Sequence, residues 1–363
     1  MSISIAGAGW VTPLGSSISE VWESLCRGDE ATAEPICDPV GAKPYLVYRG
    51  PENALTNLPR HARLRRASAI SRFSAAAGLS ALDHARSTSH KIDMQRVALV
   101  FAIANGGVIY TKRFYHDIVT TGAQSASPLL FPETVFNAPA SHLAALLGIE
   151  GASYTLVGDG AVGLVAIKMA ENLLAEDDID FCLVVAAEEA DWLLCDAYHK
   201  WRLLRAAPPI EPFAHPPRGA ILSEGAGAVL VGRNGAVRIE AAHAGKYFSS
   251  RKHAAAALTK VARDLGSDDA SVVIGSANGT FIDALERNAV GTTEIYSAKP
   301  ALGESVGASA LWQVIVATQF LATKQLPPLL HAPTRERAKI IADRVVVLSC
   351  GLNQQVAGLR LSI

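Results

Sequence analysis

The sequence predicts an α/β fold, because short apolar runs alternate with helical stretches along its length. The runs are apolar at consecutive positions rather than at every second one, which is typical of strands buried between two layers of helices. Glycine-rich segments connect them, and 50% of the 363 residues are hydrophobic. A chain of this length suits two fused core units or one large α/β body.

The expected elements follow in order. Strands are expected at residues 3–9, 96–105, 181–189, 227–232, 270–278 and 344–351, and helices at residues 68–86, 163–176 and 308–325. The helix at 163–176 is apolar nearly all round its first two turns, so we expect it in the centre of the molecule. The strand–helix rhythm runs twice, which predicts two similar halves at residues 1–235 and 236–363.

Composition excludes several classes of function. The formal net charge of −1 argues against nucleic acid or an anionic membrane as the main partner. The five cysteines are scattered and show no metal-binding spacing, so we expect a reducing compartment, the cytoplasm, and no metal or other cofactor. The first ten residues do not resemble a signal peptide, and no run of about twenty apolar residues predicts a membrane span.

The stretch YTLVGDGAVGLVA at 154–166 predicts a strand, a tight turn and a helix. Asp159 is expected to cap this helix by accepting from the amides of Ala161 or Val162. Gly160 suits the tight turn, and the alternative is that amides at this helix start hold an acyl carbonyl or an anion.

Six blocks of the sequence, taken together, resemble the β-ketoacyl synthases of the thiolase fold in order and spacing. They lie at residues 7–28, 127–151, 211–231, 276–286, 297–310 and 348–361. The resemblance implies a five-layered αβαβα fold in which two similar halves each contribute a central sheet, and it implies a dimer.

The resemblance also implies where the chemistry of the family would lie. The family uses a cysteine nucleophile at a helix start, two histidines that assist decarboxylation and stabilise charge, and a supporting lysine. The cysteine position falls on Gly160, and the histidine positions fall on Asn278 and Glu304. Only the lysine, Lys299, is retained, so three of the four reactive groups are missing.

The replaced positions allow structural and chemical interpretations. Glu304 is expected to form a buried ion pair with Lys299, and the alternative is a new general acid or base. Asn278 is expected to bond neighbouring backbone, although its amide could still donate to an oxyanion. Cys350 and Leu352 replace the phenylalanines of the family's Gly-Phe-Gly-Gly tail and, with Asp159, are candidates for lining an acyl tunnel. Cys350 and Cys195 are also the thiols to test as relocated nucleophiles, against the alternative of ordinary core residues.

The densest basic run lies at residues 59–66 and contains Arg60, Arg63, Arg65 and Arg66. Family members dock acidic acyl carrier proteins through a basic helix in this part of the chain. The alternative is a solvated helix face without a partner.

These observations predict a degenerate synthase-like subunit that resembles a chain-length factor. Such a subunit pairs with an active ketosynthase in a heterodimer and shapes its acyl tunnel while a polyketide, aryl polyene or fatty acid is elongated on a carrier protein. One alternative is a stand-alone acyl-transfer or hydrolytic enzyme that uses Glu304, Cys350 or Asp159. Another is a homodimeric acyl-binding protein.

Overall fold

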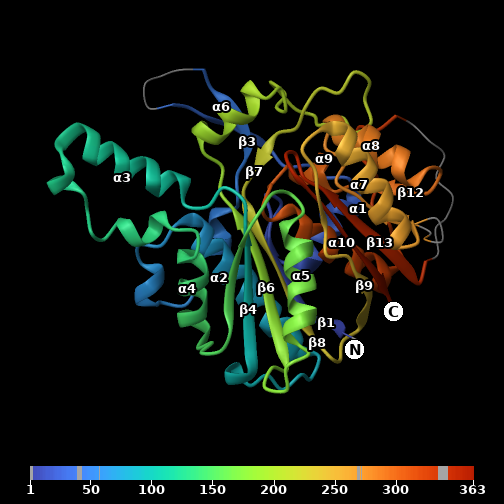
Figure 1. Ribbon diagram of the computed structural model, residues 1–363, viewed down its shortest axis with the longest axis horizontal. Helices are drawn as coiled ribbons and strands as arrows, with labels where there is room; N and C mark the ends of the chain where they lie inside the picture. Colours follow the sequence, from blue (N-terminus) through green and yellow to red (C-terminus); the bar gives the residue numbers. More distant parts are fainter. Residues whose placement is uncertain (1–2, 39–42, 57, 268–269, 271, 334–341) are drawn as a thin grey trace.

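The computed structural model describes residues 3–38, 43–56, 58–267, 270, 272–333 and 342–363. These residues form an α/β body built around one large sheet (Figure 1). The sheet has eleven strands in the order β12-β11-β13-β14-β9-β1-β8-β6-β4-β5, with β10 (Lys246–Tyr247) paired to β14. A separate three-stranded sheet contains β2 (Ala33–Ile36), β3 (Tyr45–Tyr48) and β7 (Leu222–Ser223).

The strand order of the large sheet occurs twice. The first set is β1 (Ile3–Val11), β4 (Val97–Ile103), β5 (Ser153–Val157), β6 (Phe181–Glu188) and β8 (Gly225–Gly232). The second set is β9 (Val237–Ala242), β11 (Val272–Ile274), β12 (Glu294–Tyr296), β13 (Arg344–Cys350) and β14 (Gln355–Ser362). In each set the second strand runs parallel to the third and fourth, and the fifth runs antiparallel to the fourth and first. Antiparallel pairing of β1 with β9 joins the two sets.

Helices cover the outer faces of both sets of strands and fill the layer between the two sets. They are α1 (Ile18–Arg27), α2 (Ala69–Ser87), α3 (Val108–Thr121), α4 (Ala138–Leu147), α5 (Val162–Leu173), α6 (Trp192–Lys200), α7 (Arg251–Asp264), α8 (Phe281–Val290), α9 (Lys299–Leu302) and α10 (Ser309–Thr323). Helix α2 packs on β1, β6 and β8, with α4 beside it, while α7 packs on β13 and β14, with α8 beside it. Between the two sets of strands, α5 and α10 contact both. The predicted five-layered αβαβα fold is therefore confirmed.

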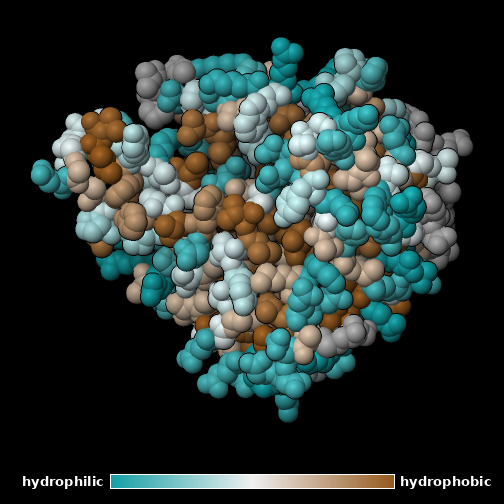
Figure 2. All heavy atoms as spheres, in the orientation of Figure 1, coloured by the Kyte–Doolittle hydropathy of each residue, from teal (hydrophilic) through white to brown (hydrophobic). Residues whose placement is uncertain are grey.

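Helix α3 extends from this body as an arm, at the left of Figure 1. It packs on the short 3₁₀ helices η4 (Ala123–Ser125) and η5 (Phe131–Thr134) and buries none of its own residues. Figure 2 shows hydrophobic side chains at the surface over this arm and in the middle of the same face. The arm therefore leaves apolar surface in contact with water.

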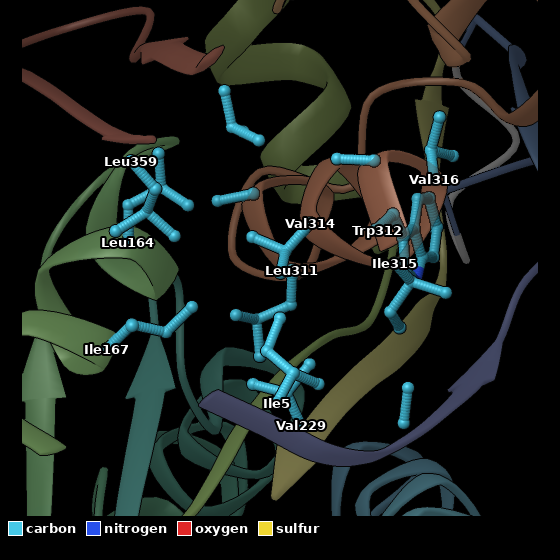
Figure 3. Close-up of a cluster of buried hydrophobic side chains, with 14 of the residues drawn as sticks. Ile5, Leu164, Ile167, Val229, Leu311, Trp312, Val314, Ile315, Val316 and Leu359 are labelled. Carbon is cyan, nitrogen blue, oxygen red and sulfur yellow. The ribbon is translucent and has the colours of Figure 1, made fainter. Parts of the chain in front are cut away.

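The central layer explains why the helix at residues 163–176 is so apolar. Leu164 and Ile167 of α5 face the same core as Leu311 of α10 and strand residues such as Leu359 (Figure 3). Gly163 lets these helices approach closely, because a β-carbon there would lie 3.1 Å from Leu311 Cγ. The predicted central position of α5 is confirmed.

Two glycines in β1 set the distance to the outer helix layer. A β-carbon on Gly7 would lie 2.2 Å from the backbone oxygen of Ala81, and one on Gly9 would lie 2.3 Å from that of Ala77. The alanines of α2 and the glycines of β1 therefore form a close helix–sheet contact that larger side chains would prevent.

One expected strand is shorter than its apolar run. The run at 270–278 predicts a strand to residue 278, but β11 ends at Ile274. The Ser276 amide donates to the Glu286 carboxylate at 2.6 Å instead of joining the sheet ladder. This early end of the strand releases the loop that carries Asn278.

Candidate functional site

The predicted nucleophile position lies in the buried turn between β5 and α5. Helix α5 begins at Val162, and its N-cap residue is Ala161, without a side-chain cap. The Val162 amide donates to the backbone oxygen of Asp159 at 2.8 Å, so the main chain satisfies this amide. The interpretation of Asp159 as the N-cap is therefore wrong.

The Asp159 carboxylate binds a turn that is almost two hundred residues away in sequence. Its Oδ2 accepts from the amides of Asn353 at 2.9 Å and Gln354 at 2.6 Å. Its Oδ1 has no hydrogen-bond partner among the described residues. Burial raises the pKa of the Asp159 carboxyl, and these amide bonds oppose that shift.

Glycines make this contact possible. A β-carbon on Gly351 would lie 1.4 Å from Asp159 Oδ1, so no side chain fits there while the carboxylate is in place. A β-carbon on Gly160 would lie 3.1 Å from the Gly351 Cα, so a side chain at the predicted nucleophile position would require the facing backbone to move. The site has no thiol at residue 160, and the backbone of Gly351 lies too close for a side chain to fit there without a shift.

The other predicted positions form one buried network. Glu304 Oε2 accepts from Lys299 Nζ at 2.5 Å and from Asn278 Nδ2 at 2.6 Å. Asn278 Oδ1 accepts from the Thr280 hydroxyl at 2.6 Å and from its amide at 3.2 Å. The predicted ion pair between Glu304 and Lys299 is present, and the predicted local bonding of Asn278 is confirmed.

Three buried carboxyls beside this network carried no assigned role in the sequence. Asp283 accepts from the amides of Asn278 and Gly279, and burial raises its pKa to about 6. Glu286 accepts from Ser276, and burial raises its pKa to about 7. Both lie in the block at 276–286 and inside α8, on the buried face that they share with Ile282 and Val290, so their helical spacing from these apolar residues was the available signal.

Glu188 is the third of these carboxyls and ends β6. Its Oε2 accepts from the amides of Ala104 and Asn105 at 3.2 Å each, and its Oε1 has no partner among the described residues. Burial raises the pKa of Glu188 to about 8. Burial therefore raises the pKa of all three carboxyls, Asp283, Glu286 and Glu188, by disfavouring their charged forms.

The two candidate thiols are core residues in this structure. Burial raises the pKa of Cys195 to about 12, and burial raises the pKa of Cys350 well above its ordinary value. A nucleophilic cysteine needs the opposite shift. The geometry thus favours the interpretation of both as structural cysteines.

Leu352 lies in the turn held by Asp159 and lines a pocket of about 270 Å³. Four of the nine other lining residues are aromatic, and these are Tyr198, Trp201, Phe248 and Phe281. The pocket brings Leu352 to a surface-facing cavity, whereas Asp159 and Cys350 lie on the buried side of the turn.

The basic run has a different local structure from the one expected. Of residues 59–66, only Ala62–Leu64 form a helix, the single-turn 3₁₀ helix η2, so the expectation of a basic helix is wrong. Leu64 is the buried residue of this turn, and one apolar position cannot form the stripe that a longer surface helix needs. The side chains of Arg60 and Arg65, with Leu55 and Leu58, line an open pocket of about 500 Å³.

Neither a metal cluster nor a membrane-spanning helix occurs in the part of the chain that the structure describes. Among the residues that the structure describes, no group of three or more histidine, cysteine, aspartate or glutamate side chains is arranged to hold a metal ion. None of the helices in the described part of the chain is long and apolar enough to cross a membrane.

Comparison with known proteins then decides the family. The model of the β-ketoacyl synthase N-terminal domain matches residues 1–235. The chain belongs to the β-ketoacyl synthase family. A 3-oxoacyl-[acyl-carrier-protein] synthase 2 of Coxiella burnetii is 21% identical, with 90% of this chain and 87% of the relative covered.

Solved structures of the family match over the whole fold. The ishigamide ketosynthase/chain length factor has a TM-score of 0.86 at 17% identity, covering 99% of this chain and 98% of the other. A ketosynthase in complex with its chain length factor from Xenorhabdus doucetiae has a TM-score of 0.80 at 16% identity, covering 100% of this chain and 98% of the other. At these identities the likeness shows the fold.

Proposed function

We propose that this β-ketoacyl synthase family member is a non-catalytic subunit, similar to a chain-length factor, that pairs with an active ketosynthase. The observation that carries the proposal is the network in place of the reactive groups. Gly160 supplies no nucleophile, and Glu304 holds both Lys299 and Asn278. Without a thiol or an imidazole at these positions, the residues present cannot carry out the thioester exchange and decarboxylation of the family.

A free sheet edge supports the pairing. Strand β5 ends the large sheet and pairs with β4 on one side. Tyr154 and Val157 of β5 are 44% and 54% exposed. Exposed large apolar residues of the arm region are Tyr115, Val119, Leu129, Phe131, Val135 and Phe136. An apolar sheet edge and an apolar arm left in water are typical of surfaces that a partner covers.

We propose that this partner is the ketosynthase, and that the acyl chain grows on an acyl carrier protein. The basic run supports the second part, since Arg60, Arg63, Arg65 and Arg66 would attract an acidic carrier protein. All five cysteines are free, which suits the reducing cytoplasm as the place of action.

Co-expression with a ketosynthase that has its cysteine and both histidines tests the pairing. We expect a one-to-one complex by native mass spectrometry, and condensation activity that requires both chains. Val157→Lys places a charge on the free edge and should abolish the complex, whereas Thr259→Lys on the exposed side of α7 is the matched control and should preserve it.

Two results would contradict the proposal. One is a homodimer that does not exchange with the ketosynthase. The other is uptake of acyl label from an acyl thioester by the purified chain alone, lost in Cys350→Ala, which would make the chain an enzyme with relocated chemistry.

A further inference from the structure

The turn at residues 351–354 separates two parts of the candidate site. Its outer side, with Leu352 and Asn353, lines the aromatic pocket of about 270 Å³. Its inner side presents the amides of Asn353 and Gln354 to Asp159. Tyr198 also lines the pocket, and its pKa is raised by burial and by the nearby charges of Glu188, Asp159 and Glu304. The pocket and the buried carboxyls therefore lie on opposite sides of a thin wall.

The inner side of this turn has the form of an anion-binding nest. Consecutive amides that converge on one oxygen make a concave site for a negative charge. Here the oxygen is Asp159 Oδ2, at 2.6 and 2.9 Å from the two nitrogens. The second carboxylate oxygen, Oδ1, is buried and without a partner among the described residues, so the carboxylate is held through this nest on one side only.

Apart from this bond, one side chain of the turn is anchored: Leu352 is 9% exposed and belongs to the same hydrophobic cluster as Tyr198 and Phe248 on the outer side. The side chains of Asn353 and Gln354 are exposed, and Gly351 has none. The bond from the Gly351 amide to the Gln355 oxygen, 2.7 Å long, is internal to the turn. On the outer side the Phe248 amide donates to the Gln354 oxygen at 2.8 Å. On the inner side the Asp159 carboxylate is thus the principal attachment.

We propose that Asp159 is an internal latch, whose carboxylate fills the amide nest of the 351–354 turn and closes the wall between the aromatic pocket and the buried network. Removal of this side chain leaves a vacant nest that binds a small free carboxylate such as acetate. The inference rests on the proposed function and deepens it. A subunit whose own pocket is latched retains no acyl chain and leaves it to the partner.

Cys350 reports the state of the latch, because it directly precedes the turn and is 1% exposed. In a Cys26→Ser/Cys37→Ser background, labelling of Cys350 by the neutral reagent N-ethylmaleimide is followed by peptide mass spectrometry. We expect labelling at least tenfold faster in Asp159→Ala, with Cys182 in β6 still protected. Asp159→Asn keeps an acceptor oxygen and should stay close to the unaltered protein.

Acetate and a matched variant complete the experiment. Sodium acetate should slow labelling of Cys350 in Asp159→Ala, whereas sodium chloride at equal ionic strength should not. Glu133→Ala is the matched variant, because the Glu133 carboxylate is also buried and accepts a hydrogen bond from the Ser68 backbone amide. This variant should leave Cys350 protected. If Asp159→Ala does not fold, hydrogen exchange of the Asn353 and Gln354 amides in the unaltered chain replaces it, and slow exchange is expected.

Unchanged labelling of Cys350 in a folded Asp159→Ala would overturn the latch. Parallel labelling of Cys350 and Cys182 would also overturn it, because that result reports loosening of the whole chain. The absence of any acetate effect, or fast exchange of the Asn353 and Gln354 amides, would overturn it as well. The measurement uses the chain without a ketosynthase, so its failure is distinct from a failure of the pairing experiment.

Discussion

The buried pair of Lys299 and Glu304 gives a test of whether the replaced site is structural or catalytic. Lys299 is 3% exposed and Glu304 is 2% exposed, and their charged atoms lie 2.5 Å apart. Lys299→Met leaves the Glu304 carboxylate buried with Asn278 as its remaining side-chain donor. Loss of one partner of such a pair costs about 3–5 kcal/mol, because an uncompensated charge remains in the interior.

Replacement of both charges should cost much less. We expect Lys299→Met and Glu304→Leu together to lie within about 2 kcal/mol of the unaltered protein, since apolar side chains of similar volume remove both desolvation penalties. The coupling free energy from the double-mutant cycle should therefore exceed about 1 kcal/mol. Urea unfolding followed by circular dichroism measures each free energy of unfolding.

The exposed pair of Lys260 and Asp264 in α7 is the matched control. Its atoms lie 2.8 Å apart, but its side chains are 48% and 33% exposed, so Lys260→Met should change stability little. If Lys299→Met also changes stability little, or if the two substitutions at the buried pair are additive, the pair is not the structural element argued above. Glu304 would then be available as an acid or base.

Three further predictions concern the turn and its surroundings. Gly351→Ala should destabilise the chain by more than about 2 kcal/mol in urea unfolding, because its β-carbon would lie 1.4 Å from Asp159 Oδ1. Asp159→Gly in the same chain should recover part of this loss, and an equal effect of Gly351→Ala with and without Asp159→Gly would contradict the prediction. Gly160→Cys alone should take up no acyl label from an acyl thioester, since its β-carbon would lie 3.1 Å from the Gly351 Cα and the turn leaves no room for a substrate beside the thiol. A stable acyl-protein would refute that expectation. Stability should fall as the pH rises from about 4.5 to about 8, because folded Glu188 keeps its proton to about pH 8 while the unfolded chain releases it near its ordinary pKa of 4.5. Glu188→Gln should reduce this fall between unfolding curves at pH 5 and pH 8, and an unchanged fall would assign it to other groups.

The fold could be predicted because it depends on local apolar runs that are long and repeated. Strands such as β4 and β6 are buried along their length, and the central helix α5 is apolar on every side that contacts another element. These patterns occur within ten to fifteen residues and need no knowledge of distant segments. The five-layered arrangement of two similar halves was implied by the family resemblance rather than by the runs themselves, and the strand order was not predicted.

The role of Asp159 could not be predicted in the same way. An aspartate three residues before the first residue of a helix resembles an N-cap, and the local pattern favours that interpretation. Its actual partners, Asn353 and Gln354, come from a turn almost two hundred residues later. The expectation of a basic helix at residues 59–66 was wrong for a related reason. The helix was implied by the family resemblance, while the residues themselves lack the apolar stripe of a surface helix.

The contacts around Gly160 argue that a cysteine placed at this position would not by itself supply the chemistry of the family. A cysteine at residue 160 would meet the backbone of Gly351, and Gly351 must itself remain a glycine while Asp159 binds the turn. At the other end, Glu304 neutralises the Lys299 charge and holds Asn278, so neither is free to act on a substrate. We therefore expect condensing chemistry to require changes at residues 159 and 160 and at Asn278 and Glu304 together. A single substitution would leave the Asp159 contact closed and Lys299 paired, which is the arrangement expected of the proposed subunit that depends on a partner for its chemistry.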